Sequence, residues 1–229
     1  MLKRKEADGL IFLGHRLPKE IATLMRTMAP KYAPVVNGCE FSPRLGIPSV
    51  HIDNAKAAGE AMAHLYSLGH RRIGIVTGPL VSPLSRDRLE GATVQAKKQG
   101  AERDFIVMNG DFSIESGAVA GARLLARREP PTATFCFNDE MAMGVYNDRP
   151  ARRYPHPRGS VCRRVRRYPL RRVHESAADN GRSTDAGDWR GHRAPADASP
   201  EDPEATPEPV TLPHILTVRS STAPATTRR

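Results

Sequence analysis

Short apolar runs alternate with stretches of helical periodicity over much of the chain. Runs rich in β-branched and aromatic residues predict strands, and apolar residues at helical spacing predict helices. Strands are expected over residues 9–14, 34–39, 49–52, 73–77, 105–108 and 134–137. Helices are expected over residues 18–28, 54–69, 85–100, 113–127 and 139–146. Such alternation predicts βαβ units with a parallel sheet, an α/β fold.

The stretch around residue 138 combines the two patterns most clearly. An apolar run, Thr134–Phe137, is followed at once by Asn138 and Asp139, and then by apolar residues at helical spacing. Ligands of open parallel sheets bind at the carboxyl ends of strands, where these two side chains are expected. Either side chain could instead cap the helix, so both interpretations stay open.

Periodicity of either kind is lost over residues 149–199, which are rich in Arg, Pro, Gly, Asp and His. This composition predicts a disordered basic segment. Order is expected again from residue 201, with a terminal strand over residues 211–221.

The net charge of +10 is concentrated in residues 149–193, and the pI is about 10.0. One hypothesis is therefore a basic nucleic-acid-binding protein that acts through this segment. Its aromatic residues are too sparse for a base-stacking platform. The three cysteines lack the spacing of a zinc site or a disulfide framework. Because no signal peptide or membrane-spanning run is visible, we expect a cytoplasmic protein without a membrane partner.

The sequence shows no catalytic set. Ser82 and Ser85 lack the Gly-x-Ser-x-Gly surroundings of a nucleophile elbow. The histidines are scattered, without a metal-ligand partner at short spacing, and glycine-rich phosphate loops are missing. We therefore expect neither an enzyme nor a bound metal or cofactor.

Several short motifs follow one another in a recognisable order. They are Leu-Gly-His-Arg-Arg-Ile-Gly at 68–74, Thr-Gly-Pro at 77–79, Arg-Asp-Arg-Leu-Glu-Gly at 86–91, Phe-Asn-Asp-Glu-Met-Ala-Met-Gly at 137–144, and Leu-Pro-His with Val-Arg-Ser-Ser-Thr at 212–222. In this order they resemble the LacI/GalR family of bacterial transcription regulators. His-Ile-Asp-Asn at 51–54 and Gly-Asp-Phe at 110–112 are most similar to the cytidine repressor branch.

The resemblance implies a type I periplasmic-binding-protein-like sensor, a two-lobed parallel-sheet sandwich that is incomplete in this chain. It implies a small sugar or nucleoside effector in the cleft and a homodimer. A helix-turn-helix head, expected before Met1, would bind operator DNA. An alternative is a solute-binding protein of the same fold, which would need a secretion signal.

The resemblance also suggests ligand-binding residues. In the family the arginine that matches Arg88 lies in the cleft and donates to the effector, although a plain helix-surface arginine is the alternative. Asn138 and Asp139 are further candidates, with helix capping as the alternative. Ser82 could hydrogen-bond a ligand or be an ordinary turn residue. Cys39 is expected near the cleft, or simply packed.

Four regions are expected on this basis. Residues 1–72 would form a partial N-terminal lobe, and residues 73–147 the C-terminal lobe. Residues 148–199 would be a disordered, out-of-frame Arg/Pro-rich segment. Residues 200–229 would supply the terminal strand of the C-terminal lobe and a tail.

The out-of-frame interpretation rests on what the family has in place of residues 149–199, namely Gly-Phe-Asp-Asp and Pro-Pro-Leu-Thr-Thr. Permitted codons for residues 160–170, read one base later, can encode Leu-Ser-Val-Val-Gly-Phe-Asp-Asp-Ile-Arg. The same offset through residue 191 can encode a run that contains Pro-Pro-Leu-Thr-Thr. We therefore expect a shift of reading frame between about residues 147 and 199.

Overall fold

A computed structural model describes residues 10–14, 23, 35–39, 47–147, 181–183, 209–219 and 221–225. The chain divides into two compact units. The first comprises Met1–Asp53, Ser82–Leu84 and Ser183–His214. The second comprises Asn54–Val81, Ser85–Arg182 and Ile215–Arg229. The expected boundaries of the four sequence regions stay a prediction.

Two pairs of parallel strands lie in the first unit. Strand β1 (Leu10–Phe12) pairs with β2 (Val35–Asn37), and β3 (Val50–Ile52) pairs with β8 (Val210–Leu212). These elements confirm the strands expected over residues 9–14, 34–39 and 49–52. The helix expected over residues 18–28 lies outside the described residues, apart from Thr23.

The second unit is built on a three-stranded parallel sheet in the order β5-β4-β6. The central strand β4 (Ile73–Thr77) is buried along its whole length. Strand β5 (Phe105–Asn109) pairs with one edge of β4, and β6 (Ala133–Cys136) pairs with the other. All three strands run in the same direction, so their carboxyl ends share one edge of the sheet.

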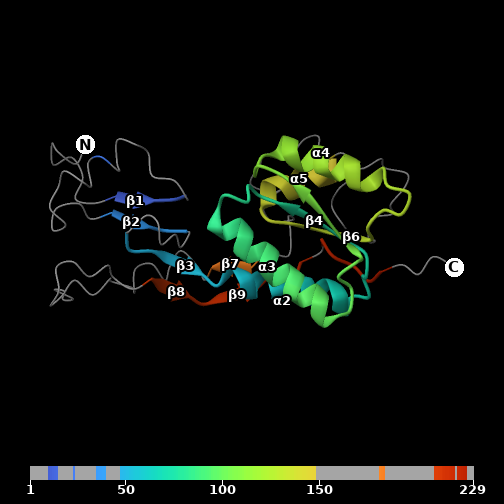
Figure 1. The fold of residues 1–229 in the computed structure, drawn as a ribbon, viewed down its shortest axis with the longest axis horizontal. Helices are drawn as coiled ribbons and strands as arrows, with labels where there is room; N and C mark the ends of the chain where they lie inside the picture. Colours follow the sequence, from blue (N-terminus) through green and yellow to red (C-terminus); the bar gives the residue numbers. More distant parts are fainter. Residues whose placement is uncertain are drawn as a thin grey trace. The chain divides into compact units, whose positions relative to one another are not determined.

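Four helices accompany this sheet. They are α2 (Asn54–Ser67), α3 (Pro83–Lys98), α4 (Ile114–Leu125) and α5 (Asp139–Asn147). Figure 1 shows α4 and α5 side by side against one side of the strands, with α2 and α3 on the other. Met62, Ile75, Leu124 and Met141 are buried in one core between strands and helices. The parallel α/β fold expected from the alternating pattern is confirmed.

Glycines set the closest approach between helices. A Cβ on Gly91 of α3 would lie 1.9 Å from the backbone oxygen of Ala55 in α2. A Cβ on Gly117 of α4 would lie 2.2 Å from the backbone oxygen of Met141 in α5. Both distances are far below van der Waals contact, so each helix pair depends on the missing side chain.

The terminal strand expected over residues 211–221 is wrong as a single element. The structure has two short strands, β8 and β9 (His214–Leu216), on either side of Pro213. Strand β9 is paired with β7 (Gly181–Ser183), whereas β8 pairs with β3. Proline has no N–H to donate and therefore interrupts a hydrogen-bond ladder. The β7 strand also lies within the range expected to be disordered, whose other residues lie outside the described part.

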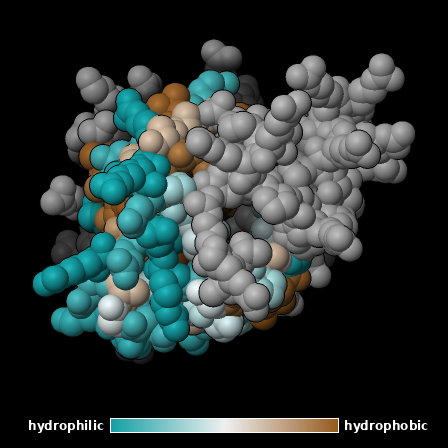
Figure 2. Space-filling view, turned by 90° about the vertical axis from the view of Figure 1, so that its right-hand side faces the viewer, coloured by the Kyte–Doolittle hydropathy of each residue, from teal (hydrophilic) through white to brown (hydrophobic). Residues whose placement is uncertain are grey.

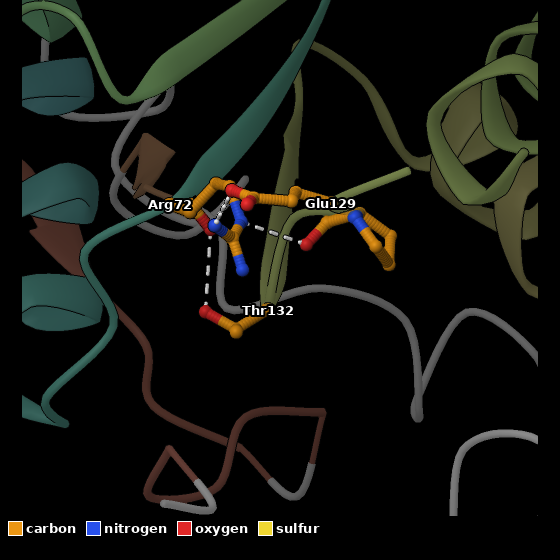
Figure 3. Close-up of polar contacts among 4 residues, drawn as sticks. Arg72, Glu129 and Thr132 are labelled. Carbon is orange, nitrogen blue, oxygen red and sulfur yellow. Dashed lines mark hydrogen bonds and ion pairs between the residues drawn. The ribbon is translucent and has the colours of Figure 1, made fainter. Parts of the chain in front are cut away.

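Polar contacts join the amino ends of β4 and β6 (Figure 3). Arg72 Nε donates to the backbone oxygen of Pro130 at 2.9 Å, and its Nη1 contacts Glu129 Oε2 at 2.7 Å. The backbone oxygen of Arg72 accepts from Thr132 N at 2.9 Å and from Thr132 Oγ1 at 3.2 Å. The ion pair is exposed and stabilises little, so the backbone contacts fix this corner.

A segment near the end of the sequence, Ser221–Ala225, packs along the second unit; we call it the tail. The buried His70 lies between Thr132 Oγ1 and the backbone oxygen of Ala223, at 3.0 and 2.9 Å from its two ring nitrogens. His64 contacts Thr222 Oγ1 at 3.0 Å. Ala225 N donates to the oxygen of Leu68, and Tyr146 donates to the oxygen of Ser221. The tail is thereby part of the second unit.

Apolar residues also reach the surface among the hydrophilic ones, as the brown areas of the space-filling view show (Figure 2). Val94 of α3 is 46% exposed and Val119 of α4 is 53% exposed. Within the described ranges, the longest apolar helical stretches fall short of what a membrane crossing requires.

Candidate functional site at the carboxyl edge of the sheet

The candidate site lies where β4, β5 and β6 end together. Backbone hydrogen bonds hold the turns that leave these strands: Gly110 N donates to Thr77 O at 2.8 Å, and Phe137 N donates to Val76 O at 3.0 Å. Thr77 Oγ1 lies 3.4 Å from Asn109 Oδ1 across two strand ends. The edge is therefore formed by residues from three strands that are far apart in the sequence.

Arg88 extends from α3 to this edge. Its Nε donates to Asn54 Oδ1 at 3.0 Å, and its Nη1 donates to the backbone oxygen of Phe137. Asn54 is buried at the first turn of α2, and Phe137 follows β6. The planar guanidinium can hold several acceptors at fixed angles, which suits it to this position between a helix and a strand end.

Asn138 uses both ends of its amide within the chain. Its Oδ1 accepts from Met141 N at 3.0 Å, which caps α5 as the sequence suggested. Its Nδ2 donates to the backbone oxygen of Phe112 at 2.7 Å. The structure thus confirms that Asn138 caps α5. A ligand contact of Asn138 stays a prediction.

Phe112 has an unusual backbone, with φ of 75°. This left-handed conformation is uncommon for a bulky residue and here is held by the Asn138 hydrogen bond. The phenyl ring lies against Gly78, since a Cβ built on Gly78 would be 2.1 Å from the ring carbon Cζ. The same Cβ would be 2.7 Å from Ser85 Oγ. Gly78 therefore lets an aromatic ring and a hydroxyl group approach the end of β4.

Asp111 begins the turn before α4. Its Oδ1 accepts from Ser113 N at 2.9 Å and from Ser113 Oγ at 2.5 Å, and Ser113 caps the helix. The hydrogen bond from the Ser113 hydroxyl, followed by that from the Ser113 backbone, lowers the pKa of Asp111 to about 2. The carboxylate is charged near neutral pH and accepts both hydrogen bonds from Ser113, in the turn that carries Phe112.

The remaining candidates from the sequence are distributed over the two units. Asp139 is half-buried in the first turn of α5. Ser82 is buried just before α3 and belongs to the first unit. Cys39 is half-buried in the first unit, where its N donates to Asn37 Oδ1 at 3.4 Å. Arg88, Asn138 and Asp139 share the second unit; the ligand-binding roles of all five residues stay predictions.

Sequence reasoning missed three residues at this edge as candidate ligand contacts, namely Asn54, Ser85 and Phe112. Asn54 and Phe112 were visible only as parts of motifs. Nothing in the local sequence distinguishes Ser85 from an exposed serine in a first helical turn. The structure buries it completely.

The edge combines a guanidinium, amide groups, hydroxyls and one aromatic ring. Such groups hydrogen-bond and stack on small polar molecules rather than activate a nucleophile. Among the described residues, no three His, Cys, Asp or Glu side chains gather as a metal site. The chemistry of the edge therefore fits binding of a small polar molecule.

Comparison with known proteins agrees with this chemistry. Residues 1–151 match the model for periplasmic binding proteins and the sugar binding domain of the LacI family. The HTH-type transcriptional repressor CytR of Escherichia coli (strain K12) is 41% identical over 142 residues, which cover 62% of this chain and 41% of CytR.

Solved structures give the same result. A LacI transcriptional regulator from a Rhodococcus species aligns with a TM-score of 0.56 and 29% identity, covering 64% of this chain and 53% of that one. The regulator CelR, solved as a complex with cellobiose, aligns with a TM-score of 0.53 and 26% identity, covering 63% of this chain and 44% of that one.

The expected resemblance and the periplasmic-binding-protein-like fold are thus confirmed. The chain spans less than half the length of CytR. The family match ends at residue 151, close to the start of the basic segment at residue 149. The chain belongs to the family of periplasmic binding proteins and sugar-binding domains of LacI-type regulators.

Proposed function

We propose that this chain is part of the effector-sensing domain of a DNA-binding transcriptional repressor. The observation that carries the proposal is the match of the LacI sugar-binding-domain model over residues 1–151. In the whole regulator, a helix-turn-helix head would bind operator DNA and two copies would form a homodimer. Such a regulator would act in the cytoplasm, where its operator lies, and would not be an enzyme.

The effector we propose is a small sugar or nucleoside at the carboxyl edge of β4, β5 and β6. The planar donors of Arg88 suit hydroxyl and base-edge oxygens. CelR, a structural neighbour, binds cellobiose. Asn138 and Asp139 belong to the same unit as Arg88 and directly follow Phe137, whose backbone oxygen accepts from Arg88. Effector binding would change the relative populations of two sensor conformations and so alter DNA binding.

Calorimetric titration of the full 229-residue chain with cytidine, adenosine, D-ribose and cellobiose tests the proposal. We expect saturable binding of at least one probe, weakened at least tenfold in Arg88→Lys. Arg103→Lys is the matched control, because Arg103 is exposed in the loop before β5. Binding of every probe that is indifferent to Arg88→Lys would contradict the role of Arg88. Absence of binding to the whole panel would contradict a site for these effectors within this chain.

We also propose that residues 148–199 are translated out of frame, and that the four expected regions describe the organisation of this chain. The family match ends near the start of this segment, which supports the proposal. The alternative of a protein that acts by nucleic-acid binding through residues 149–193 is not favoured, because the chain matches the ligand-binding domain of LacI-family regulators. Deleting residues 149–193 should therefore remove no specific DNA-binding activity. Salt-dependent DNA binding that disappears with this deletion would contradict the proposal. The alternative of a solute-binding protein is not favoured either, since the relatives are regulators.

A further inference from the structure

Asn54 brings a polar amide into the buried first turn of α2, where it is only 4% exposed. A buried amide is unfavourable unless it is hydrogen-bonded, so its partners indicate why it is there. Its Oδ1 accepts a hydrogen bond from Arg88 Nε at 3.0 Å. One partner of this buried amide is therefore the arginine that we propose as an effector contact.

Arg88 has a long side chain, which takes a single orientation only when contacts hold it. Two acceptors meet its guanidinium: Asn54 Oδ1 at Nε, and the backbone oxygen of Phe137 at Nη1. The first acceptor belongs to α2 and the second follows β6. Because the guanidinium is planar, contacts at two of its nitrogens from two different elements fix both its position and its plane.

The backbones that carry this hydrogen bond are also packed closely. Gly91 follows Arg88 by three positions and Ala55 follows Asn54 by one. A Cβ on Gly91 would lie 1.9 Å from Ala55 O, so α2 and α3 approach each other about one helical turn from the hydrogen bond. A side chain held by such closely packed elements is oriented before a ligand arrives, which lowers the entropic cost of binding.

We propose that Asn54 is a positioning residue, which holds Arg88 in the orientation that binds the effector. Arg88 is half-buried, so a small molecule can reach its exposed part, and the buried Asn54 acts on the effector through it. The inference rests on the proposed function and adds the residue that prepares its main contact. A merely structural asparagine would stabilise α2 without changing what Arg88 does.

Two substitutions of similar size separate these roles in calorimetric titrations of the full chain. Asn54→Asp keeps an oxygen acceptor for Arg88 Nε, so it should bind the best probe among cytidine, adenosine, D-ribose and cellobiose within about twofold of the wild type. Asn54→Leu has no acceptor and should weaken binding of that probe by about five- to tenfold. Equal losses in both variants would overturn the positioning role.

A double-mutant cycle shows whether Asn54 acts through Arg88. In an Arg88→Lys background, Asn54→Leu should change the affinity by less than about twofold, because the guanidinium that it positions is gone. Independent residues would instead weaken binding by the product of their separate effects. Such a product would overturn the inference.

Leu65→Val is the matched control for lost stability. Leu65 is buried in the same helix, about three turns beyond Asn54 and about 16 Å away along the helix axis. Its substitution should lower the melting temperature without changing the affinity for the probe. A loss of affinity in Leu65→Val as large as that in Asn54→Leu would show that stability alone is responsible, and would overturn the inference.

The outcomes separate this inference from the function on which it rests. Binding that weakens in Arg88→Lys but not in Asn54→Leu overturns the positioning role alone. A wild-type chain that binds none of the probes overturns the proposed effector site and the role of Asn54 with it.

Discussion

The guanidinium of Arg88 donates a hydrogen bond to the backbone oxygen of Phe137, so that α3 is tied to the end of β6. Its second contact, with Asn54, reaches the first turn of α2. A single side chain thus joins two helices and a strand at the edge where we propose that the effector binds. The position of these three elements depends on a group that also has the chemistry to contact a ligand.

Replacing Arg88 should therefore affect the free protein as well as binding. We expect Arg88→Met to lower the free energy of unfolding by about 1–3 kcal/mol. The substitution removes charge-assisted hydrogen bonds, and the side-chain oxygen of Asn54 and the backbone oxygen of Phe137 lose this donor. Urea denaturation followed by circular dichroism measures the change. Arg103→Met, on an exposed loop, should stay within about 0.5 kcal/mol of the wild type. Equal stabilities of the two variants would show that the Arg88 contacts stabilise nothing.

Two glycines at the contact of α2 and α3 form a matched pair. A Cβ on Gly91 would lie 1.9 Å from Ala55 O, whereas a Cβ on Gly59 would lie at an ordinary 3.6 Å from Gly91 O. Gly91→Ala should thus destabilise the chain by about 1–3 kcal/mol through overpacking. Gly59→Ala should be neutral or stabilise by up to about 1 kcal/mol, because alanine favours a helix. Thermal unfolding of both variants measures these changes in stability. A Gly91→Ala variant as stable as the wild type would contradict the close approach of α2 and α3.

The pKa of Asp111 gives a prediction for acid conditions. It is lowered to about 2 in the folded chain, chiefly by the Ser113 hydroxyl. A carboxyl group with a lowered folded pKa stabilises above its unfolded pKa of about 4, and this contribution is lost as the pH falls through about 2. Asp111→Asn should then reduce the melting temperature at pH 6 but match the wild type near pH 2.

The control for that experiment is Glu102→Gln, which removes one negative charge from an exposed loop. The difference in melting temperature between Glu102→Gln and the wild type should not disappear near pH 2 in the way expected for Asp111→Asn. A constant difference in melting temperature between Asp111→Asn and the wild type from pH 6 to pH 2 would show that the negative charge of Asp111 does not stabilise the turn.

His70 is expected to be the main anchor of the tail. It is buried and contacts both Thr132 and Ala223. His70→Ala should cost about 1–3 kcal/mol, because it leaves the half-buried carbonyl group of Ala223 without this donor and creates a small cavity. His64→Ala, which removes a half-buried contact with Thr222, should cost less. Hydrogen exchange at Ala225 N should increase in His70→Ala; unchanged exchange there would contradict the anchoring role.

The coding DNA should show the proposed change of frame directly. Codons for residues 160–170, read one base later, are expected to encode a segment that contains Gly-Phe-Asp-Asp. Resequencing the locus through residue 223 measures this, with the codons of residues 73–147 as an internal control for the original frame. Codons that yield no such segment in the shifted frame would end the proposal.

Local pattern was sufficient for most of the fold. Strands and helices from residue 49 to residue 147 follow the apolar periodicity, because each element needs one buried face. The terminal strand failed at Pro213, where the apolar alternation continues but the backbone donor is missing. Asn138 could be foreseen as a cap because capping is a local interaction.

The candidate site was less accessible to sequence reasoning. The motif around Arg88 indicated its importance, yet its partners Asn54 and Phe137 lie 34 and 49 residues away along the chain. The burial of Ser85 arises from Gly78 and Phe112, which come from two other parts of the sequence. No local pattern encodes such a meeting of distant segments.

The contact of His64 with Thr222 joins residues 158 positions apart. During synthesis, α2 and the strands of the sheet leave the ribosome long before the tail does. Because His70, His64 and Tyr146 each have a partner in the tail, these contacts can form only after residues 221–225 have been synthesised. A chain that stops before residue 221 would lack these contacts, and a unit with fewer stabilising contacts is more exposed to proteolysis.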